Sequence, residues 1–300
     1  MKNLLKLMDL SEKEIVEILN TADQLKFEKK NGIPHRLLEG KVLGLIFAKS
    51  STRTRVSFEV GMFDLGGTSL FLSSRDLQIG RGEIVQDTAR VLSRYLDGIM
   101  IRTFDQREVE ALAEFGTIPI INGLTDYCHP CQVLADLMTI REYKGNIKGR
   151  KLCYIGDGNN MTNSLIVGGI KLGMEVSVAC PAGYEPDADI MKWAYESGRF
   201  SCSPDVLEMA QNSDVLYTDV WASMGQEGEA EERKKVFKSY QINDKVLSVS
   251  KPDAMVLHCL PAHREEEITS KVFEEHSREI FDEAENRLHA QKAVLVKCLL

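Results

Sequence analysis

The stretch VLGLIFAKSSTRTR, residues 42–55, joins a short apolar run to a cluster of hydroxyl and guanidinium side chains. The apolar run 42–48 has the length and composition of a buried strand. Beyond the cluster, apolar residues recur at helical spacing from 56 to 63 and stop at Gly66-Gly67, which predicts a helix. A strand that passes directly into a helix is the unit of parallel α/β sheets, so this junction indicates the fold class.

The same alternation continues along the chain. Short apolar runs predict further strands at 68–72, 98–102, 118–121, 151–155, 175–179, 215–218 and 255–259. Helical periodicity predicts helices at 10–29, with Ser11 as N-cap, and at 84–96, 106–115, 131–143, 162–172, 187–197 and 204–210. We therefore predict an α/β protein of two doubly wound parallel-sheet domains joined by bridging helices. The polar stretch 223–238 predicts a loop with a surface helix.

Composition and charge restrict the class of protein. With 300 residues, 43% of them hydrophobic and 27% charged, the chain is long and apolar enough for two packed domains. The net charge of −8 argues against a general nucleic-acid binder, because neutralising phosphates needs clustered Lys and Arg. The sequence lacks both a signal-peptide core and an apolar run near the roughly 20 residues that span a bilayer. We expect a cytoplasmic protein with neither a nucleic-acid nor a membrane partner.

The cysteines favour reduced thiols. Seven cysteines are an odd number, and the chain has no signal peptide, so a disulfide framework is not indicated. Cys128 and Cys131 form a C-x-x-C pattern, which is typical of redox dithiols and of half a zinc site. The sequence has no second C-x-x-C, but a redox or zinc protein stays as a rival interpretation.

The hydroxyls and arginines of residues 51–54 stand where a helix is predicted to begin. A helix N-terminus offers unpaired N–H groups and partial positive charge, which suit a phosphate. A capping serine followed by solvated arginines would give the same local pattern. The stretch lacks the G-x-x-x-x-G-K-[ST] pattern, so a nucleoside triphosphate is not implied. Arg102 closes a predicted strand and can reach the same anion, or it can be an exposed strand-end arginine.

Three other polar clusters follow predicted strands, and another opens a predicted helix. His129 and Gln132 open the helix 131–143 and can bond a carbonyl oxygen and an amide. The sequence GDGNN, residues 156–160, invites a dinucleotide interpretation, but the G-x-G-x-x-G pattern fails at Met161. The next strand also ends at Cys180, where a ribose-binding acid is expected, so a nicotinamide dehydrogenase is disfavoured. The asparagines of GDGNN, Asn159 and Asn160, either bind a polar ligand or cap the helix.

The last two clusters are DVWASMG, residues 219–225, and HCLPAHR, residues 258–264. Asp219 suits an ammonium group, and the Ser-Met backbone that follows suits a carboxylate. Each cluster alone is more often structural than functional. Five such clusters predict one cleft between the domains, because ligands of parallel sheets bind at the carboxyl ends of strands.

The chain contains five motifs in a fixed order: S-T-R-T-R, H-P-C-Q, G-D-G-N-N, D-x-W-x-S-M-G and H-C-L-P. In these motifs and their order, the chain resembles the ornithine branch of the aspartate/ornithine carbamoyltransferase family. The resemblance extends from about residue 10 to the final helix. SMG distinguishes the ornithine users from the aspartate users. The chain departs from the family pattern at Glu265, where glycine is expected, and at Cys131, where threonine is common.

The resemblance implies a trimer of two-domain subunits, without a metal or cofactor. Residues 1–144 would bind carbamoyl phosphate, with the C-terminal helix 287–300 packed back on them, and residues 145–286 would bind L-ornithine. The implied carbamoyl-phosphate contacts are Ser51, Thr52, Arg53, Thr54, Gln78, Arg102, His129, Gln132, Cys259, Leu260 and Arg287. Gln78 would reach a neighbouring subunit's site. The implied ornithine contacts are Asn160, Asp219, Ser223 and Met224. The implied catalytic residues are Thr54, Arg102, His129 and Cys259.

The implied reaction is transfer of the carbamoyl group of carbamoyl phosphate to the δ-amine of L-ornithine, giving L-citrulline and phosphate. Two alternatives remain at this point. One is a carbamoyltransferase for another amine such as putrescine, and the other is a non-catalytic sensor of a phosphate ligand on the same scaffold. The sequence does not distinguish a biosynthetic from a degradative role.

Overall fold

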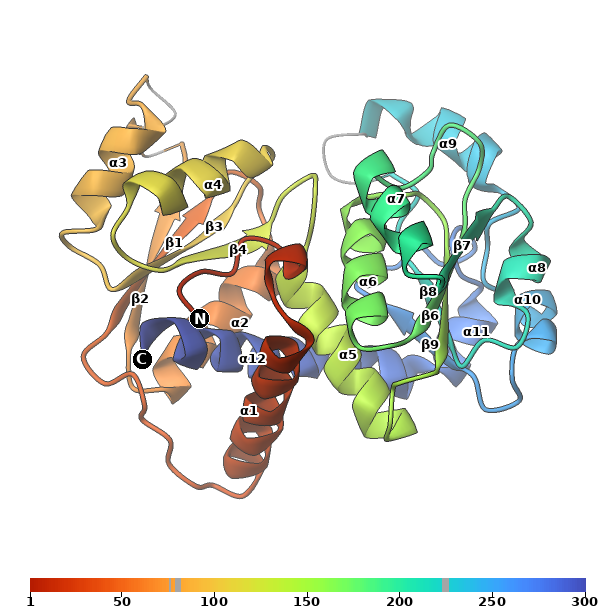
Figure 1. The fold of residues 1–300 in the computed structure, drawn as a ribbon, viewed down its shortest axis with the longest axis horizontal. Helices are drawn as coiled ribbons and strands as arrows, with labels where there is room; N and C mark the ends of the chain where they lie inside the picture. Colours follow the sequence, from red (N-terminus) through yellow and green to blue (C-terminus); the bar gives the residue numbers. More distant parts are fainter. Residues whose placement is uncertain (76, 79–81, 223–226) are drawn as a thin grey trace. The chain divides into compact units, whose positions relative to one another are not determined.

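The computed structural model describes residues 1–75, 77–78, 82–222 and 227–300, and Figure 1 shows their ribbon. The contacts among these residues define two units, Met1–Ala135 with Arg287–Leu300 (unit 1) and Asp136–Asn286 (unit 2). Helices α5 (Pro130–Lys144) and α12 (Ser277–Leu299) each run from one unit into the other. Each unit is built on its own parallel sheet, so the predicted fold class is confirmed.

The described part of unit 1 contains a four-stranded sheet in the order β2-β1-β3-β4. Its strands are β1 (Val42–Phe47), β2 (Thr68–Ser73), β3 (Gly98–Arg102) and β4 (Ile120–Leu124). In the register, Phe47 at the end of β1 pairs with Arg102 at the end of β3. The residues that follow β1 therefore begin beside Arg102, at the carboxyl edge where ligands of parallel sheets bind.

The predicted helices of unit 1 are present, although the one predicted at 84–96 ends at Leu92 and the short turn Leu7–Asp9 was not predicted. The helices of this unit are η1 (Leu7–Asp9), α1 (Glu12–Lys30), α2 (Thr52–Asp64), α3 (Val85–Leu92) and α4 (Gln106–Phe115). Ser11 caps α1 as predicted, because its Oγ accepts from the Glu14 N–H at 3.2 Å while the Glu14 carboxylate accepts from the Ser11 N–H at 2.8 Å. Strand β4 starts two residues later than expected and includes Leu124.

Helix α12 begins at Ser277, ten residues before the expected start at Arg287. Its last part packs on α2, where an added Cβ at Gly61 would lie 3.3 Å from Lys292 Cγ. The Lys292 side chain is fully buried, and its Nζ lies 2.9 Å from His35 Nε2 and 3.4 Å from Asp64 Oδ2. These polar partners make burial of the ammonium tolerable.

The described part of unit 2 contains a five-stranded sheet in the order β7-β6-β5-β8-β9. Its strands are β5 (Lys151–Ile155), β6 (Glu175–Ala179), β7 (Phe200–Ser203), β8 (Val215–Thr218) and β9 (Met255–His258). The sequence did not predict β7, because this short edge strand is only partly buried and carries two serines. The helices and turns that belong wholly to unit 2 are α6 (Asn160–Lys171), α7 (Ala188–Glu196), α8 (Val206–Ala210), η3 (Glu227–Glu229), α9 (Ala230–Phe237), α10 (Asp244–Val249) and α11 (Ser270–Glu275).

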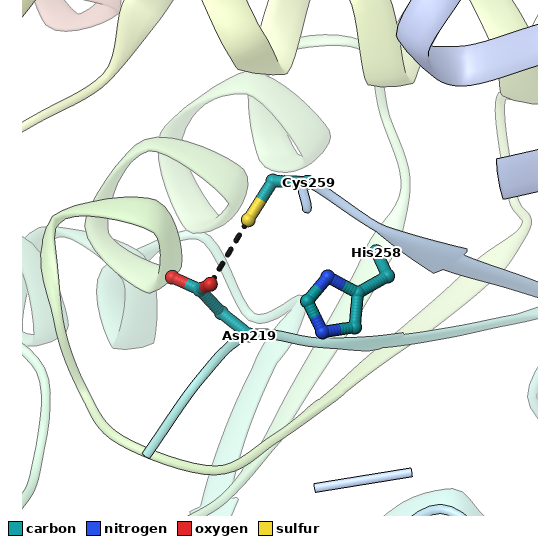
Figure 2. Close-up of side chains that lie close together, drawn as sticks. All are labelled: Asp219, His258 and Cys259. Carbon is teal, nitrogen blue, oxygen red and sulfur yellow. Dashed lines mark hydrogen bonds between the residues drawn. The ribbon is translucent and has the colours of Figure 1, made fainter. Parts of the chain in front are cut away.

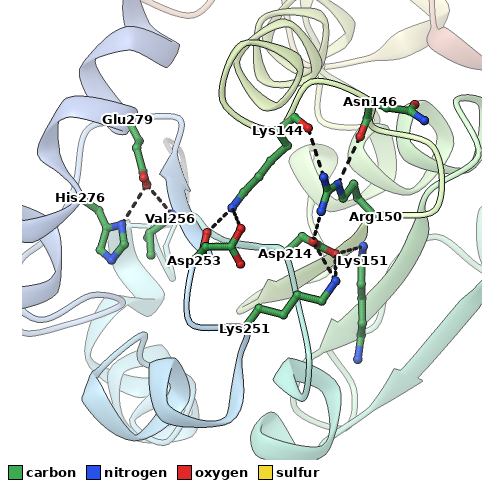
Figure 3. A network of polar contacts seen from close by, with 10 residues as sticks. All are labelled: Lys144, Asn146, Arg150, Lys151, Asp214, Lys251, Asp253, Val256, His276 and Glu279. Atoms are coloured by element: carbon green, nitrogen blue, oxygen red, sulfur yellow. Dashed lines mark hydrogen bonds and ion pairs between the residues drawn. The ribbon is translucent and has the colours of Figure 1, made fainter.

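A buried carboxylate organises the amino ends of the strands in unit 2 (Figure 3). Asp214, which is fully buried, accepts hydrogen bonds of 2.9 Å from Lys151 N–H, Arg150 Nη1 and Lys251 Nζ. Burial raises the pKa of Asp214, but these donors more than offset that effect and hold it below 3.8. Asp214 therefore joins the starts of β5 and β8 to the segment before β9.

None of the helices in the described ranges combines the length and apolar character needed to cross a membrane.

Candidate active site

The N-terminus of α2 is built around the Thr54 hydroxyl. Ser51 is the N-cap of this helix, and its Oγ accepts from the Thr54 N–H at 3.2 Å. The same Oγ lies 3.0 Å from Thr54 Oγ1. Thr54 is fully buried, whereas Thr52 is exposed and Arg53 is partly buried. The predicted anion-binding stretch is therefore a true helix N-terminus, with one hydroxyl directed into the protein.

Two arginines from distant segments converge on that hydroxyl. Arg287 of α12 donates through Nη2 to Thr54 Oγ1 at 2.8 Å and through Nη1 to Gln132 Oε1 at 2.5 Å. Arg102, at the end of β3, places Nη1 3.5 Å from the same Thr54 oxygen. The fold thus gathers positive charge at the helix N-terminus, where an anion is doubly favoured.

His129 lies buried among these cations. Burial, together with the positive charges of Arg287, Arg102 and Arg53, holds the pKa of His129 well below 6.5. The imidazole is therefore neutral near pH 7. It can donate one hydrogen bond to a carbonyl oxygen without carrying a charge that would repel the arginines.

In unit 1 the structure brings together six of the predicted side chains, which are Ser51, Thr54, Arg102, His129, Gln132 and Arg287. Thr52 and Arg53 lie in the first turn of the same helix. Gln78 lies beyond β2 with an exposed side chain, and its carbonyl oxygen accepts from the Glu83 N–H at 3.1 Å. Its contact with a neighbouring subunit stays a prediction.

The carboxyl ends of β8 and β9 in unit 2 form an acid–thiol pair. Figure 2 shows Asp219 and Cys259 directed toward each other, and the Cys259 thiol donates to Asp219 Oδ1 at 3.0 Å. Asp219 also accepts from the Val220 N–H at 2.8 Å and, through Oδ2, from Asn159 Nδ2 at 3.0 Å. Burial raises the pKa of the Cys259 thiol well above 9.0, and the Asp219 charge and hydrogen bond add to this effect. Cys259 is consequently a neutral thiol that donates to a carboxylate.

His258 stabilises the turn that carries Cys259. Its Nδ1 accepts from the Leu260 N–H at 2.9 Å, so its Nε2 carries the proton and lies 2.9 Å from Glu267 Oε1. Leu260 adopts a positive φ of 57° in this turn. The ligand atoms of Asp219, His258 and Cys259 lie within 4.8 Å of one another, a spacing that could hold a metal ion. Both ring nitrogens of His258 already have protein partners, which favours the acid–thiol interpretation.

The two asparagines of the GDGNN turn differ in their positions, because one caps α6 and the other begins it. Asn159 is the N-cap of α6 and accepts from the Met161 and Thr162 N–H groups at 2.9 and 3.2 Å. Asn160 is the first residue of α6 and is partly buried at the same edge of the sheet. The predicted ornithine contacts Ser223 and Met224 lie outside the described residues.

Sequence reasoning did not identify two cations at these edges. Lys49 is almost buried just beyond β1, pairs with Asp126 and lies 4.4 Å from the centre of the Phe104 ring. Arg233 of α9 donates at 2.8 Å to both Asp157 Oδ2 and the Trp221 carbonyl, so it ties the GDGNN turn to the segment after Asp219. Lys49 was detectable as the cation that ends the apolar run 42–48. The i,i+4 pair of Arg233 with Glu229 is typical of a surface helix, and no pattern in the sequence indicated Asp157 and Trp221, which are 76 and 12 residues away.

Two expectations about sequence patterns are also resolved. Burial raises the pKa of both Cys128 and Cys131 to about 12, which argues against a reactive C-x-x-C dithiol. Glu265, which stands where the family pattern has glycine, adopts the left-handed φ of 68° that glycine prefers. Its carboxylate accepts from the Ser270 N–H at 2.8 Å, a local hydrogen bond that glycine could not make.

Two family models match the chain. Residues 2–142 match the aspartate/ornithine carbamoyltransferase carbamoyl-P binding domain. Residues 148–298 match the Asp/Orn binding domain of the same family.

Named relatives agree with these matches. The ornithine carbamoyltransferase of Pyrococcus abyssi is 55% identical over 99% of this chain and 96% of its own length. The solved ornithine carbamoyltransferase of Pyrococcus furiosus has a TM-score of 0.93 at 56% identity, with 98% of this chain and 96% of that chain covered. The anabolic ornithine carbamoyltransferase of Campylobacter jejuni has a TM-score of 0.93 at 41% identity over 99% of each chain. Sequence and fold together show that this chain belongs to the aspartate/ornithine carbamoyltransferase family.

Proposed function

We propose that the protein transfers the carbamoyl group of carbamoyl phosphate to the δ-amine of L-ornithine, giving L-citrulline and phosphate. The observation that carries this proposal is the convergence of Arg102 and Arg287 on Thr54 at a helix N-terminus, beside a neutral histidine. The relatives named ornithine carbamoyltransferase match over almost the whole chain, which supports the same reaction.

Residues 1–144 with 287–300 would form the carbamoyl-phosphate domain, and residues 145–286 the ornithine domain. Ser51, Thr52 and Arg53 bind the phosphate group at the start of α2, together with Arg287 and a neighbouring subunit's Gln78. Thr54, Arg102 and His129 donate to the carbamoyl oxygen. Gln132 and the backbone carbonyls near Cys259 and Leu260 accept from the carbamoyl amine.

Thr54, Arg102 and His129 donate to the oxygen on which negative charge develops during the reaction. Attack of the amine on the carbamoyl carbon places negative charge on the carbamoyl oxygen, and a single preorganised donor there is worth about 3 kcal/mol. Arg287 and Arg102 already supply hydrogens to Thr54 Oγ1, so the hydroxyl's own hydrogen is available to a ligand oxygen. His129 donates as a neutral imidazole, because burial and the neighbouring arginines lower its pKa. Holding both substrates in place supplies much of the remaining acceleration.

Proton transfer must accompany the attack. A free alkylamine has a pKa of about 10.4, so the cationic site must favour the neutral amine. Nitrogen then bonds to the carbamoyl carbon, and the tetrahedral intermediate expels phosphate as the C–O bond breaks. Cys259 is a neutral thiol bonded to Asp219, which makes it an orienting donor. We assign the role of proton acceptor to the departing phosphate.

Ornithine recognition would use unit 2. The Asp219 carboxylate pairs with the α-ammonium group, and Asn160 with Ser223 and Met224 binds the α-carboxylate. Putrescine has no carboxylate, so the D-x-W-x-S-M-G motif favours the amino acid over this rival.

We further propose a cytoplasmic trimer with a biosynthetic role. Unit 1 exposes large apolar side chains on α2 and on the edge strand β2, notably Phe63 (78% exposed), Leu70 and Phe71, which suit a subunit interface. The biosynthetic role follows the relatives named anabolic in Pyrococcus furiosus and Campylobacter jejuni. Analytical ultracentrifugation tests the trimer, and replacing Phe63 by Glu should weaken it.

One assay separates the candidate functions. The carbamoylated product and the released phosphate are measured for carbamoyl phosphate with ornithine, putrescine, aspartate and N-acetylornithine as acceptors in parallel. We expect turnover with ornithine to exceed that with each other amine by at least about 100-fold, because putrescine lacks the α-carboxylate, N-acetylornithine has a blocked α-amine and aspartate has no δ-amine. Preferred turnover of putrescine would support that rival. Tight binding of carbamoyl phosphate without product from any amine would support a sensor.

A further inference from the structure

Two cysteines in unit 2 are close neighbours, although 22 residues separate them in the sequence. The Sγ atoms of Cys180 and Cys202 lie 3.7 Å apart. Neither thiol belongs to the C-x-x-C pattern, and neither has a place in the proposed reaction. Their proximity therefore requires a separate explanation.

The sheet explains how the two thiols meet. Strands β6 and β7 are parallel, and Val178 of β6 pairs with Cys202 of β7. Cys180 follows Val178 by two residues, so the side chains of Cys180 and Cys202 leave the same face of the sheet. Cys180 is 3% exposed, whereas Cys202 is partly exposed on an edge strand. One thiol of the pair is thus accessible and the other is protected beside it.

The pair is also electrostatically asymmetric. The Cys180 thiol hydrogen-bonds to Cys202, which lowers the pKa of Cys202 below 9.0 despite its burial and the nearby Glu185 charge. The same interaction, together with burial, raises the pKa of Cys180. This is the division of roles found in dithiols that exchange with disulfides, in which one sulfur attacks and the other resolves. By contrast, burial raises the pKa of Cys128, Cys131, Cys153 and Cys298 to about 12.

We propose that Cys180 and Cys202 form a reversible thiol–disulfide exchange site for small disulfides. The Cys202 thiolate attacks one sulfur of the disulfide, forms a mixed disulfide and releases one thiolate. Cys180 then loses its proton to that thiolate and attacks Cys202 Sγ, which releases the second small thiolate, and this thiolate takes up from solvent the proton that Cys202 gave up. The protein loses two hydrogens and the small disulfide is reduced to two thiols, so atoms and electrons balance.

The position of the pair connects it to the GDGNN turn. Cys180 begins the segment 180–187, in which the Tyr184 carbonyl accepts from the Gly158 N–H at 2.9 Å. An added Cβ at Gly158 would lie 2.3 Å from the backbone of Glu185 and Pro186, so the segment and the turn are in close contact. Bond formation must shorten the sulfur separation from 3.7 Å to about 2.05 Å.

The test uses the full native chain and oxidised glutathione. After incubation, free thiols are alkylated under denaturing conditions, and tryptic peptides are identified by mass spectrometry. Lys192 and Arg199 lie between the two cysteines, so a Cys180–Cys202 bond joins two different peptides. We expect this linked pair in the wild type and a stable glutathione adduct on Cys202 in Cys180→Ser. Cys153→Ser is the matched control and should form the linked pair like the wild type.

Two results would overturn the proposal. One is a wild-type protein that retains glutathione on Cys202 without forming the linked peptides. The other is a native protein in which Cys202 exchanges no faster than the buried Cys153. Both are read from the wild-type chain, so the test stands even if Cys180→Ser fails to fold. Neither readout depends on carbamoyl transfer, so the outcome is separate from that of the proposed function.

Discussion

Arg287 donates a hydrogen bond of 2.8 Å to the hydroxyl of Thr54, from which it is separated by 233 residues. The same guanidinium holds Gln132, so one side chain of α12 joins α2 to α5 within unit 1. A preorganised arginine of this kind fixes the direction of its partners before a ligand binds. Thr54 Oγ1 also accepts from Arg102, and accepting from these two cations leaves the hydrogen of the hydroxyl for the ligand.

Thr54→Val removes this hydroxyl while keeping the shape of the side chain. We expect kcat to fall by about 100-fold to 1,000-fold, because one donor to the developing oxyanion is lost. Thr54→Ser keeps the hydroxyl and should stay within about 10-fold of the wild type. Steady-state citrulline kinetics measure both variants, and a valine variant with near-normal kcat would remove Thr54 from the chemistry.

Arg53 and Arg55 form a matched pair two residues apart. Arg53→Ala should abolish measurable turnover, because we place its charge on the phosphate group. Arg55 pairs with Glu59 at 2.9 Å and lies 3.8 Å from the centre of the Phe71 ring, so Arg55→Ala should leave kcat within a few-fold of the wild type. Circular dichroism checks that each variant is folded. Equal activity of the two variants would contradict the assignment of Arg53 to the phosphate group.

Cys259→Ala should raise the KM for ornithine by about 10-fold to 100-fold, since it removes a hydrogen bond to a carboxylate. Cys259→Ser keeps a donor to Asp219 and should show a smaller change. The pKa of the thiol is raised, so the group stays protonated through neutral pH. The pH–rate profile of the serine variant should therefore match that of the wild type. A basic limb that disappears in Cys259→Ser would assign proton transfer to the thiol.

Arg233→Met tests the support of the ornithine site. The change removes the bonds to Asp157 and Trp221 and leaves a buried carboxylate without its cation. We expect the KM for ornithine to rise at least about 10-fold, and the KM for carbamoyl phosphate to change less than about two-fold. Lys235→Met, at an exposed position of the same helix, is the control. Equal increases in both KM values would indicate general destabilisation.

Asp214→Asn tests the polar network of Figure 3 through its pH dependence. The folded pKa of Asp214 is depressed, so its contribution to stability is present above the unfolded pKa of about 3.9 and is lost as pH falls through the folded value. The variant should be less stable by about 2 kcal/mol at pH 7, a moderate value because the cationic partners are partly exposed. Urea unfolding measures the difference, which should narrow below pH 4. A constant difference from pH 7 to pH 3 would assign the effect to packing.

Local pattern was sufficient for most of the fold. The ranges 98–102, 106–115 and 151–155 coincide with β3, α4 and β5 because each combines clear periodicity with a nearby stop signal. Strand β7 was missed because four half-exposed residues at a sheet edge carry little hydrophobic signal. The start of α12 was placed ten residues late because the resemblance indicated Arg287 as a functional residue, not as a helix boundary.

The sequence by itself determined the alternation of strands and helices, the N-terminus of α2 and the order of the family motifs, because these depend on neighbouring residues. Only the tertiary structure decided that Arg287 would meet Thr54, that Arg233 would hold Asp157, and that Cys180 would pair with Cys202. Those contacts join segments far apart in the chain, and the sheet register and helix packing that create them leave no periodic trace in the sequence.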